Sequence, residues 1–426
     1  MHLLRQRRFA LLLGGLAVNA IGSWTSLIAI WGYATYRYHG GPGVVALLVA
    51  CWSGPAAVLG PLAGTPIDRF GPRRVLLSGY VITAVIATTM ALSNTLGELI
   101  ALVTIYGVLR AFSIPAADAL PPRVVAPAEL LAANALFGAT EQLALVIGPL
   151  AAAIAIGVAG VQAAFFFDAL TYLVGAAAVA GLRLSHPPVV GAEPRDGVWA
   201  GIAALWASRS LRLVLALATV TFVMWGGFAV VEPLYVREVL HRPPSQLGFF
   251  QVAFGIGLVS TSLLVPRLGE RAIGLRPLSI CVICSAAGSL LYVGTRSVVL
   301  AYVGVTLWGI SGAFFWAPTV TMLQRAAPVS VHGRVLGAFR ALNGWSNLVA
   351  LPLIGVTASA WGVRTAAACV AALAISVGAA SLTVVRFRSA QFGVTADRAH
   401  GEAPQLPRAA LRSAPSPFSS GPGSPL

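Results

Sequence analysis

The stretch that decides the fold is Gly64-Thr65-Pro66-Ile67-Asp68-Arg69-Phe70-Gly71-Pro72-Arg73-Arg74, with the pattern G-x-x-x-D-R-x-G-x-R-R. It is predicted to form a short charged loop between two long apolar segments. Under the positive-inside rule, an Arg-rich loop between two membrane spans stays on the cytoplasmic side. The stretch therefore predicts a membrane protein, and it predicts which side of the membrane this loop occupies.

The composition indicates the same class of protein. The chain has 426 residues, of which 58% are hydrophobic and 10% charged, and its mean hydropathy is +0.84. Soluble domains carry roughly 25% charged residues. Apolar runs of about 20 residues match helices that cross a hydrocarbon core about 30 Å thick. We expect an all-helical fold, because open strands would leave backbone groups unpaired in lipid.

Twelve apolar runs are long enough to cross a membrane. They are residues 9–36, 43–65, 75–93, 97–117, 133–157, 162–183, 211–235, 245–265, 277–295, 298–322, 335–358 and 363–385. Because twelve is an even number, both termini are expected on the same side.

The Arg residues predict which side that is, since all 28 basic residues are Arg. With a cytoplasmic amino terminus, 21 of them fall in cytoplasmic segments and five outside, at Arg37, Arg237, Arg242, Arg296 and Arg364. Arg110 and Arg340 lie within or at the edge of spans and are not counted. This asymmetry predicts a multi-pass protein of the inner (cytoplasmic) membrane with both termini in the cytoplasm. The net charge of +15 adds attraction to anionic lipid, and its dispersal over the loops argues against nucleic-acid binding.

A polar, Pro-rich segment at 185–210 divides the spans into an amino-terminal bundle, 1–184, and a carboxy-terminal bundle, 211–388. This segment is expected to be a cytoplasmic linker, whose amphipathic piece around 199–206 lies along the membrane interface. The tail at 389–426 is rich in Ser, Pro, Gly and Ala and is expected to be a disordered cytoplasmic segment.

An internal repeat relates the two bundles. A shift of 203 residues places Pro115 on Pro318 and Gly148-Pro149 on Leu351-Pro352. A shift of 202 residues places Asp68-Arg69 on Glu270-Arg271, within the stretch Pro266-x-x-x-Glu270-Arg271-x-x-Gly274-x-Arg276. Three matches in the same order indicate a duplicated six-helix unit.

The opening stretch resembles the loop between helices 2 and 3 of the major facilitator superfamily of transporters. The resemblance implies twelve transmembrane helices in two pseudo-symmetric six-helix bundles, with the substrate site between them near the midplane. In that family the Asp of this loop caps the start of helix 11 and helps to keep the cytoplasmic side closed. The partner here would be the turn at 333–335, and the latch would comprise Gly64, Asp68, Arg69, Gly71, Arg73 and Arg74. Its glycines would allow close helix approach and a tight turn; the alternative is that these charges only set the topology.

Four further stretches are similar to the exporter branch of this superfamily, which includes enterobactin exporters and macrolide efflux proteins. They are Arg110-Ala111-Phe112-Ser113-Ile114-Pro115-Ala116-Ala117-Asp118, Asn134-Ala135-Leu136, Ile147-Gly148-Pro149 and Ala164-Phe165-Phe166-Phe167-Asp168. The resemblance covers residues 9–385. Gly148-Pro149 also resembles the helix 5 motif of antiporters, although Ala152-Ala153 stand where that motif has glycines.

Ionisable residues at membrane depth are the candidates for ion coupling. Inserting a charged carboxyl at the middle of a membrane span costs about 2.5–3.5 kcal/mol or more on insertion scales. A carboxyl at that depth therefore indicates a functional or structural role. In a dry pocket it can hold a proton and release it when water or a cation enters, as proton-for-substrate exchange requires. The candidates are Glu141, Asp168 and Arg110. Glu141 could instead pair with Arg340 or Arg110, Asp168 could be structural, and Arg110 could be an anchor at a helix end.

Polar and aromatic residues are expected to line a central cavity. The candidates are Asn19, Trp24, Gln142, Gln251, Trp308, Trp316, Arg340, Asn343 and Asn347. Trp residues also form interfacial belts, so any one of them could be an anchor. An apolar, aromatic cavity with one or two carboxylates suits a bulky hydrophobic substrate, including a cationic one.

The sequence contains no phosphate-binding loop, metal-ligand spacing or nucleophile–base pair, so we expect neither an enzyme nor a cofactor or metal. An ion gradient must then supply the energy for transport, and we expect the coupling ion to be the proton. We predict a secondary-active efflux transporter that exchanges protons for an amphiphilic drug, antibiotic or siderophore by alternating access. Its expected partners are this small molecule, protons and membrane lipid, and it is expected to be a monomer. The alternatives are a proton-coupled importer of a metabolite or sugar and, more remotely, a membrane sensor without transport activity.

Overall fold

The computed structural model describes residues 2–182, 209–326 and 332–401, and within them every regular element is a helix. The chain forms two compact units, residues 1–382 and 383–426. Most of the predicted linker, including its amphipathic piece at 199–206, lies outside the described residues.

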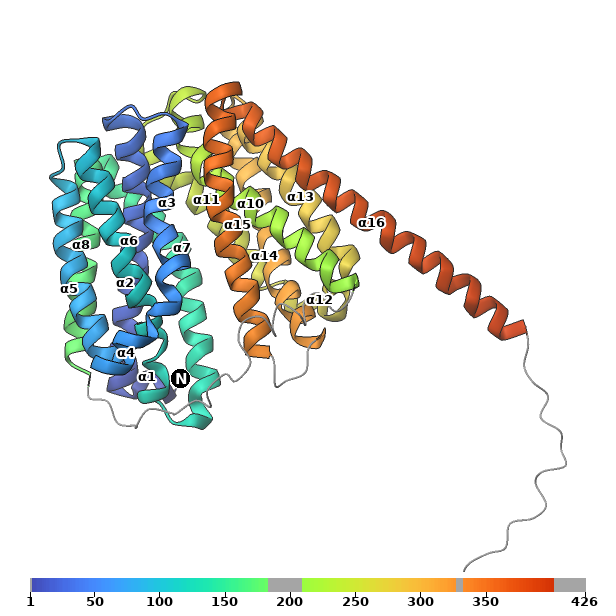
Figure 1. The fold of residues 1–426 in the computed structure, drawn as a ribbon, viewed down its shortest axis with the longest axis horizontal. Helices are drawn as coiled ribbons and strands as arrows, with labels where there is room; N and C mark the ends of the chain where they lie inside the picture. The colour runs from blue at the N-terminus through green and yellow to red at the C-terminus, as the bar shows by residue number, and fades with distance from the viewer. Residues whose placement is uncertain (1, 183–208, 327–331, 402–426) are drawn as a thin grey trace, which may run out of the picture. The chain divides into compact units, whose positions relative to one another are not determined.

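Long helices make up most of the described chain, and Figure 1 shows them in order from blue to red. The first six are α2 (Arg7–Gly32), extended by a π-helical turn (Tyr33–Arg37), α3 (Pro42–Leu59), α5 (Pro72–Ala91), α6 (Leu96–Asp118), α7 (Leu130–Ala159) and α8 (Val161–Ala180). The next six are α10 (Arg209–Glu238), α11 (Ser245–Ser262), α13 (Leu275–Gly294), α14 (Val298–Ala326), α15 (His332–Trp361) and α16 (Val363–Gly401). Short helices are α1 (His2–Arg5), α4 (Gly64–Phe70) and α12 (Val265–Leu268), with 3-10 turns at Gly60–Leu62, Pro121–Arg123, Pro127–Glu129 and Gly269–Ala272.

Among the described residues, 11 helices are long and apolar enough to cross a membrane. They correspond to all the predicted spans except residues 245–265, where helix α11 lies. Helix α11 is as long as α3, at 18 residues, but Gln246 and Gln251 lower its hydropathy. It nevertheless packs along α7 and α14, inside the helix assembly.

The charged stretch that opened the sequence is helical over most of its length, where a loop was predicted. Residues Gly64–Phe70 form α4, with Pro66 in the first turn, where a missing N–H costs nothing. Gly71 ends this helix at φ +83°, a backbone conformation that favours glycine, and Pro72 begins α5. A Cβ at Gly64 would meet nothing within 4 Å, so the close helix approach expected there is not present.

The second copy of this stretch folds in the same way. Helix α12 and the following 3-10 turn occupy residues 265–272, and Gly274, at φ +152°, precedes helix α13. Each copy is therefore a short helical segment, and a glycine of positive φ stands between it and the next long helix. This agreement supports the predicted duplication.

Helices of the two predicted bundles pack against each other along two seams, α3 with α15 and α7 with α11. A third junction lies where α2 and α10 end. There the Tyr36 hydroxyl donates to Arg242 O at 2.6 Å, and Arg237 donates to Thr35 O and to Gly40 O. Each bundle thus uses a side chain to bond backbone carbonyls of the other at this end.

Helix α16 continues to Gly401, so residues 389–401 are helical where the sequence predicted disorder. No proline interrupts the chain between Pro352 and Pro404, and Ala, Gln and Arg in this segment favour helix. The remainder of the predicted tail, 402–426, lies outside the described residues.

A test of the packing follows from Gly309, where α14 crosses α11. A Cβ at this position would lie 2.0 Å from Phe254 O, a backbone atom that cannot move by itself. Gly309→Ala should therefore lower the free energy of unfolding by roughly 1–3 kcal/mol, as overpacking does. The matched control is Gly337→Ala, because its Cβ would meet nothing within 4 Å. Thermal unfolding of the two variants in detergent makes the comparison, and equal stability would contradict the packing.

Candidate functional site

A central cavity of about 600 Å³ lies between helices of both bundles, within the unit formed by residues 1–382. Its lining comes from α2, α3, α7, α10, α11, α14 and α15. The lining residues are Trp24, Leu27, Trp31, Val49, Trp52, Ser53, Leu145, Trp225, Gly226, Phe228, Ala229, Glu232, Gln251, Phe254, Leu258, Trp308, Arg340, Asn343, Gly344, Asn347 and Leu351. Aromatic and aliphatic side chains dominate, as in sites that bind apolar small molecules.

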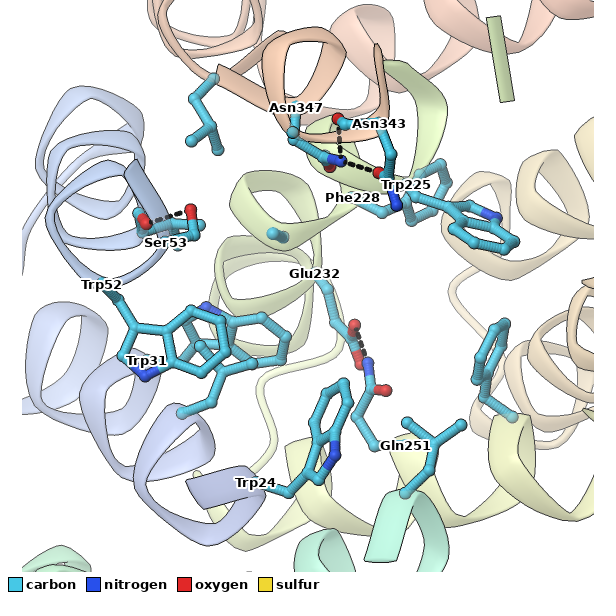
Figure 2. Close-up of a pocket in the computed structure, with 18 of the residues that line it drawn as sticks. Trp24, Trp31, Trp52, Ser53, Trp225, Phe228, Glu232, Gln251, Asn343 and Asn347 are labelled. Atoms are coloured by element: carbon cyan, nitrogen blue, oxygen red, sulfur yellow. Dashed lines mark hydrogen bonds between the residues drawn. The ribbon is translucent and has the colours of Figure 1, made fainter. Parts of the chain in front are cut away.

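Aromatic rings form the wall contributed by α10, α11 and α14. The ring centroids of Phe228 and Trp308 are 4.4 Å apart, and those of Phe254 and Trp308 are 5.0 Å apart in an edge-to-face arrangement. Trp24, Trp31 and Trp52 supply large rings from the amino-terminal bundle (Figure 2). This wall is apolar, yet its π faces attract cations.

Glu232 on α10 is a carboxylate in the cavity wall that sequence reasoning missed. Its side chain points toward Gln251 (Figure 2), whose Nε2 donates to Oε2 at 2.5 Å. The hydroxyl of Tyr292 donates to Oε1 at 3.0 Å, and the residue is 1% exposed. Among the described residues, no Arg or His lies within 4.0 Å of this carboxylate. Glu232 therefore has two neutral donors and no ionic partner.

The reason that Glu232 was missed lies in the predicted boundary of its helix. The apolar run was placed at 211–235, which put Glu232 beside an expected helix end, near Arg237 and Glu238. Helix α10 in fact continues to Glu238 and turns this carboxyl inward. Apolar residues on both sides, Val230-Val231 and Leu234-Tyr235, were the signal that could have found it.

Six of the nine cavity residues predicted from sequence line the cavity. They are Trp24, Gln251, Trp308, Arg340, Asn343 and Asn347. The other three, Asn19, Gln142 and Trp316, are not among the lining residues. Arg340, Asn343 and Asn347 recur at the spacing of one helix face, which gives α15 a polar stripe toward the cavity.

Asp168 lies inside the amino-terminal bundle and is not part of the cavity lining. It is fully buried, and Oδ2 accepts hydrogen bonds from Ser26 Oγ at 2.5 Å and from the Tyr106 hydroxyl at 3.0 Å. The hydroxyl of Tyr172 in turn donates to that of Tyr106 at 3.1 Å. These bonds join α2, α6 and α8 around one carboxyl, as its structural alternative would require. The coupling role of Asp168 stays a prediction.

Arg110 and Glu141, the other predicted coupling residues, lie close enough to interact electrostatically. The Arg110 guanidinium carbon is 4.1 Å from the ring centroid of Trp52, a lining residue, so Arg110 lies directly behind the cavity wall. Glu141 is exposed and also interacts with Asp118 at the end of α6. Asp118 interacts with Arg340, so the charges form a series from one bundle to the other.

Gly148 and Pro149 hold α7 against two neighbours. A Cβ at Gly148 would lie 2.5 Å from Trp24 Cβ, and Thr25 Oγ1 donates to Gly148 O at 2.9 Å. Pro149 O lies 2.4 Å from the Cβ position of Gly248 on α11. The motif therefore brings α7 close to α2 on one side and to the other bundle on the other.

Comparison with known families decides the identity of this assembly. The model of the Major Facilitator Superfamily matches residues 12–350 and 214–418. The chain belongs to this superfamily. Its members are transporters and not enzymes, so the predicted fold and family are confirmed.

Relatives in this superfamily are distant. The chain is 21% identical to the uncharacterized MFS-type transporter YfiS of Bacillus subtilis, over 88% of this chain and 93% of the relative. It is 24% identical to the multidrug efflux pump Tap of Mycobacterium tuberculosis, over 88% and 92%. Macrolide efflux protein A of Streptococcus pyogenes is 22% identical, over 62% of this chain and 67% of the relative. Enterobactin exporter EntS of Shigella flexneri is 25% identical, over 71% of this chain and 74% of the relative.

Solved structures share the fold. A mutant of the nucleoside transporter NupG superposes with a TM-score of 0.73 at 11% identity, covering 89% of this chain and 99% of NupG. A bacterial homologue of the human lysosomal transporter Spinster, inward-facing and unoccupied, gives a TM-score of 0.71 at 13% identity, over 89% and 97%.

The superfamily motif of the opening stretch makes contacts within its own bundle. Arg73 donates from Nε to Val179 O at 3.1 Å and from Nη2 to Ala180 O, at the end of α8. Asp68 is exposed and bonds no other described residue, and the side chains at 332–334, where its predicted partner lies, are outside the described ones. The latch stays a prediction.

A structural role of Asp168 can be tested by replacing its carboxylate. Asp168→Asn should destabilise the protein by about 1–3 kcal/mol, because the hydroxyls of Ser26 and Tyr106 would donate to a neutral amide oxygen instead of a carboxylate oxygen. Any transport activity should persist in the folded protein. Glu98→Gln makes the same chemical change at an exposed capping box, where Gln serves as well, and should leave stability unchanged. A stable Asp168→Asn protein that has lost proton movement would instead support the predicted coupling role.

Proposed function

We propose that this protein is a secondary-active exporter that exchanges protons for an amphiphilic small molecule by alternating access. The observation that carries the proposal is Glu232, a buried carboxylate without an ionic partner in the wall of an aromatic cavity. Ionisable groups at such positions in membrane proteins mark ion and substrate pathways.

The nature of the cavity supports a bulky apolar substrate. Its volume of about 600 Å³ lies in the range of small-molecule sites. Its polar groups are few and are concentrated on α15 and around Glu232, so they could orient an amphiphile but would not surround a sugar. Relatives named as a multidrug efflux pump, a macrolide efflux protein and an enterobactin exporter make export the favoured direction.

Glu232 is the group that we assign to coupling, with Glu141 and Arg110 as predicted members of the same pathway. A buried carboxylate is costly unless its charge is neutralised or hydrogen-bonded. A proton can neutralise it while the cavity is empty, and substrate binding can displace that proton. Proton and substrate would then occupy the site in turn, as antiport requires.

Alternating access would come from rocking of residues 1–184 against 211–388. With the predicted cytoplasmic amino terminus, the junction of Tyr36 with Arg242 and of Arg237 with Thr35 lies on the outer side. Those bonds would keep the outer side closed while substrate enters from the cytoplasm, and they would have to break for release.

The test uses inside-out vesicles with an acidic lumen and a panel of dyes, antibiotics and siderophores, read by a quenched fluorescent amine. A transported compound should raise lumenal pH, because protons leave as it enters. Glu232→Gln should reduce this response to the level of vesicles without the protein, since a neutral amide cannot carry the proton. Downhill exchange of the same compound should remain.

Glu98→Gln is the matched control and should respond as the wild type does. Full proton release by Glu232→Gln would show that Glu232 is not the coupling residue. Glu141→Gln would then be the next variant to test. If no compound moves protons although the protein is folded, the importer, or a sensor without transport, becomes the better explanation.

A further inference from the structure

The balance of charge in the cavity bears on the class of molecule that it binds. Among the described lining residues, the ionisable side chains are Glu232 and Arg340. They come from α10 and α15, respectively, and their surroundings differ.

Arg340 has a nearby counter-charge, because it interacts electrostatically with Asp118 at the end of α6. Glu232 does not. The groups that bond its oxygens, Gln251 from α11 and Tyr292 from α13, are neutral donors. When Glu232 is ionised, the cavity therefore holds a negative charge without a nearby counter-charge, and this charge lies on the α10 wall.

Aromatic rings line the same cavity as this carboxyl. Phe228 lies four residues before Glu232 and so on the same face of α10, and its ring packs against Trp308. Trp24 from α2 lines the same cavity (Figure 2). A cation over such rings is attracted by their π faces, and the attraction is stronger where water is excluded. An anion receives no such attraction and would be repelled by the carboxylate.

We infer that the substrate is a lipophilic organic monocation whose positive group binds between Glu232 and the rings of Trp24, Phe228 and Trp308. That this cation is a transported substrate rests on the proposed function. The binding site itself is argued from the cavity geometry and does not depend on that function. A cation and a proton satisfy the same carboxylate, so the arrival of one favours the departure of the other.

The experiment compares two ions of matched size and shape and opposite sign, tetraphenylphosphonium and tetraphenylborate. Equilibrium dialysis at fixed pH measures their binding to the purified full-length protein in neutral detergent, after subtraction of binding to empty micelles. The wild type should bind the phosphonium at least roughly tenfold more tightly than the borate, which corresponds to about 1.4 kcal/mol. This comparison requires no variant.

Variants then assign the preference to the carboxylate. Glu232→Gln should lose the preference for the cation while retaining apolar binding, and Glu98→Gln should keep it. A wild type that binds the two ions equally, or prefers the borate, would overturn the inference, as would a Glu232→Gln protein with the full preference.

The two proposals can fail separately. If the two ions bind equally but a substrate still drives proton release in vesicles, the inferred cationic substrate is wrong and the proposed antiport is retained. If phosphonium binding depends on Glu232 but no compound moves protons, the cation site is retained and the proposed antiport is wrong.

Discussion

No water reaches the hydrocarbon core of a membrane, so every polar group at that depth must find its partner within the protein. The helical backbone meets this constraint throughout the described residues, and close helix contacts exclude lipid from the polar interior. At Gly148 and Gly309 the approach is so close that a methyl group would overlap a neighbouring helix. The rest of the structure follows from how the side chains meet the same constraint.

Within the described parts of the chain, Asp168 and Glu232 are the fully buried carboxyls, and they meet it in different ways. Asp168 binds hydroxyls from α2 and α6 within one bundle, and the result is a packed polar core. Glu232 also receives two hydrogen bonds, but it lies in the wall of the cavity among aromatic rings. A carboxyl within a bundle can stabilise one arrangement of helices, whereas a carboxyl at the cavity can respond to what enters it.

Much of the fold could be predicted from the sequence, because hydropathy reports which segments can be solvated by lipid. The predicted runs match the long helices, and the repeat was visible from three matches in the same order, among them Pro115 with Pro318. Local details were less accessible. The stretch at 64–70 is a helix where a loop was expected, since its charges mark its location and not its backbone conformation. The helix beyond residue 388 was missed for the same reason, because a composition low in apolar residues does not by itself prevent a helix.

For the site, sequence alone determined the class of protein, its family resemblance and six of the nine cavity residues predicted, because those residues are polar or aromatic within apolar spans. Tertiary structure decided which carboxyl reaches the cavity. Asp168 and Glu232 are both isolated acids in apolar helices, and hydropathy cannot distinguish them. The direction in which each side chain points depends on helix rotation and on partners such as Tyr106 and Tyr292, which are distant in sequence and adjacent only after packing.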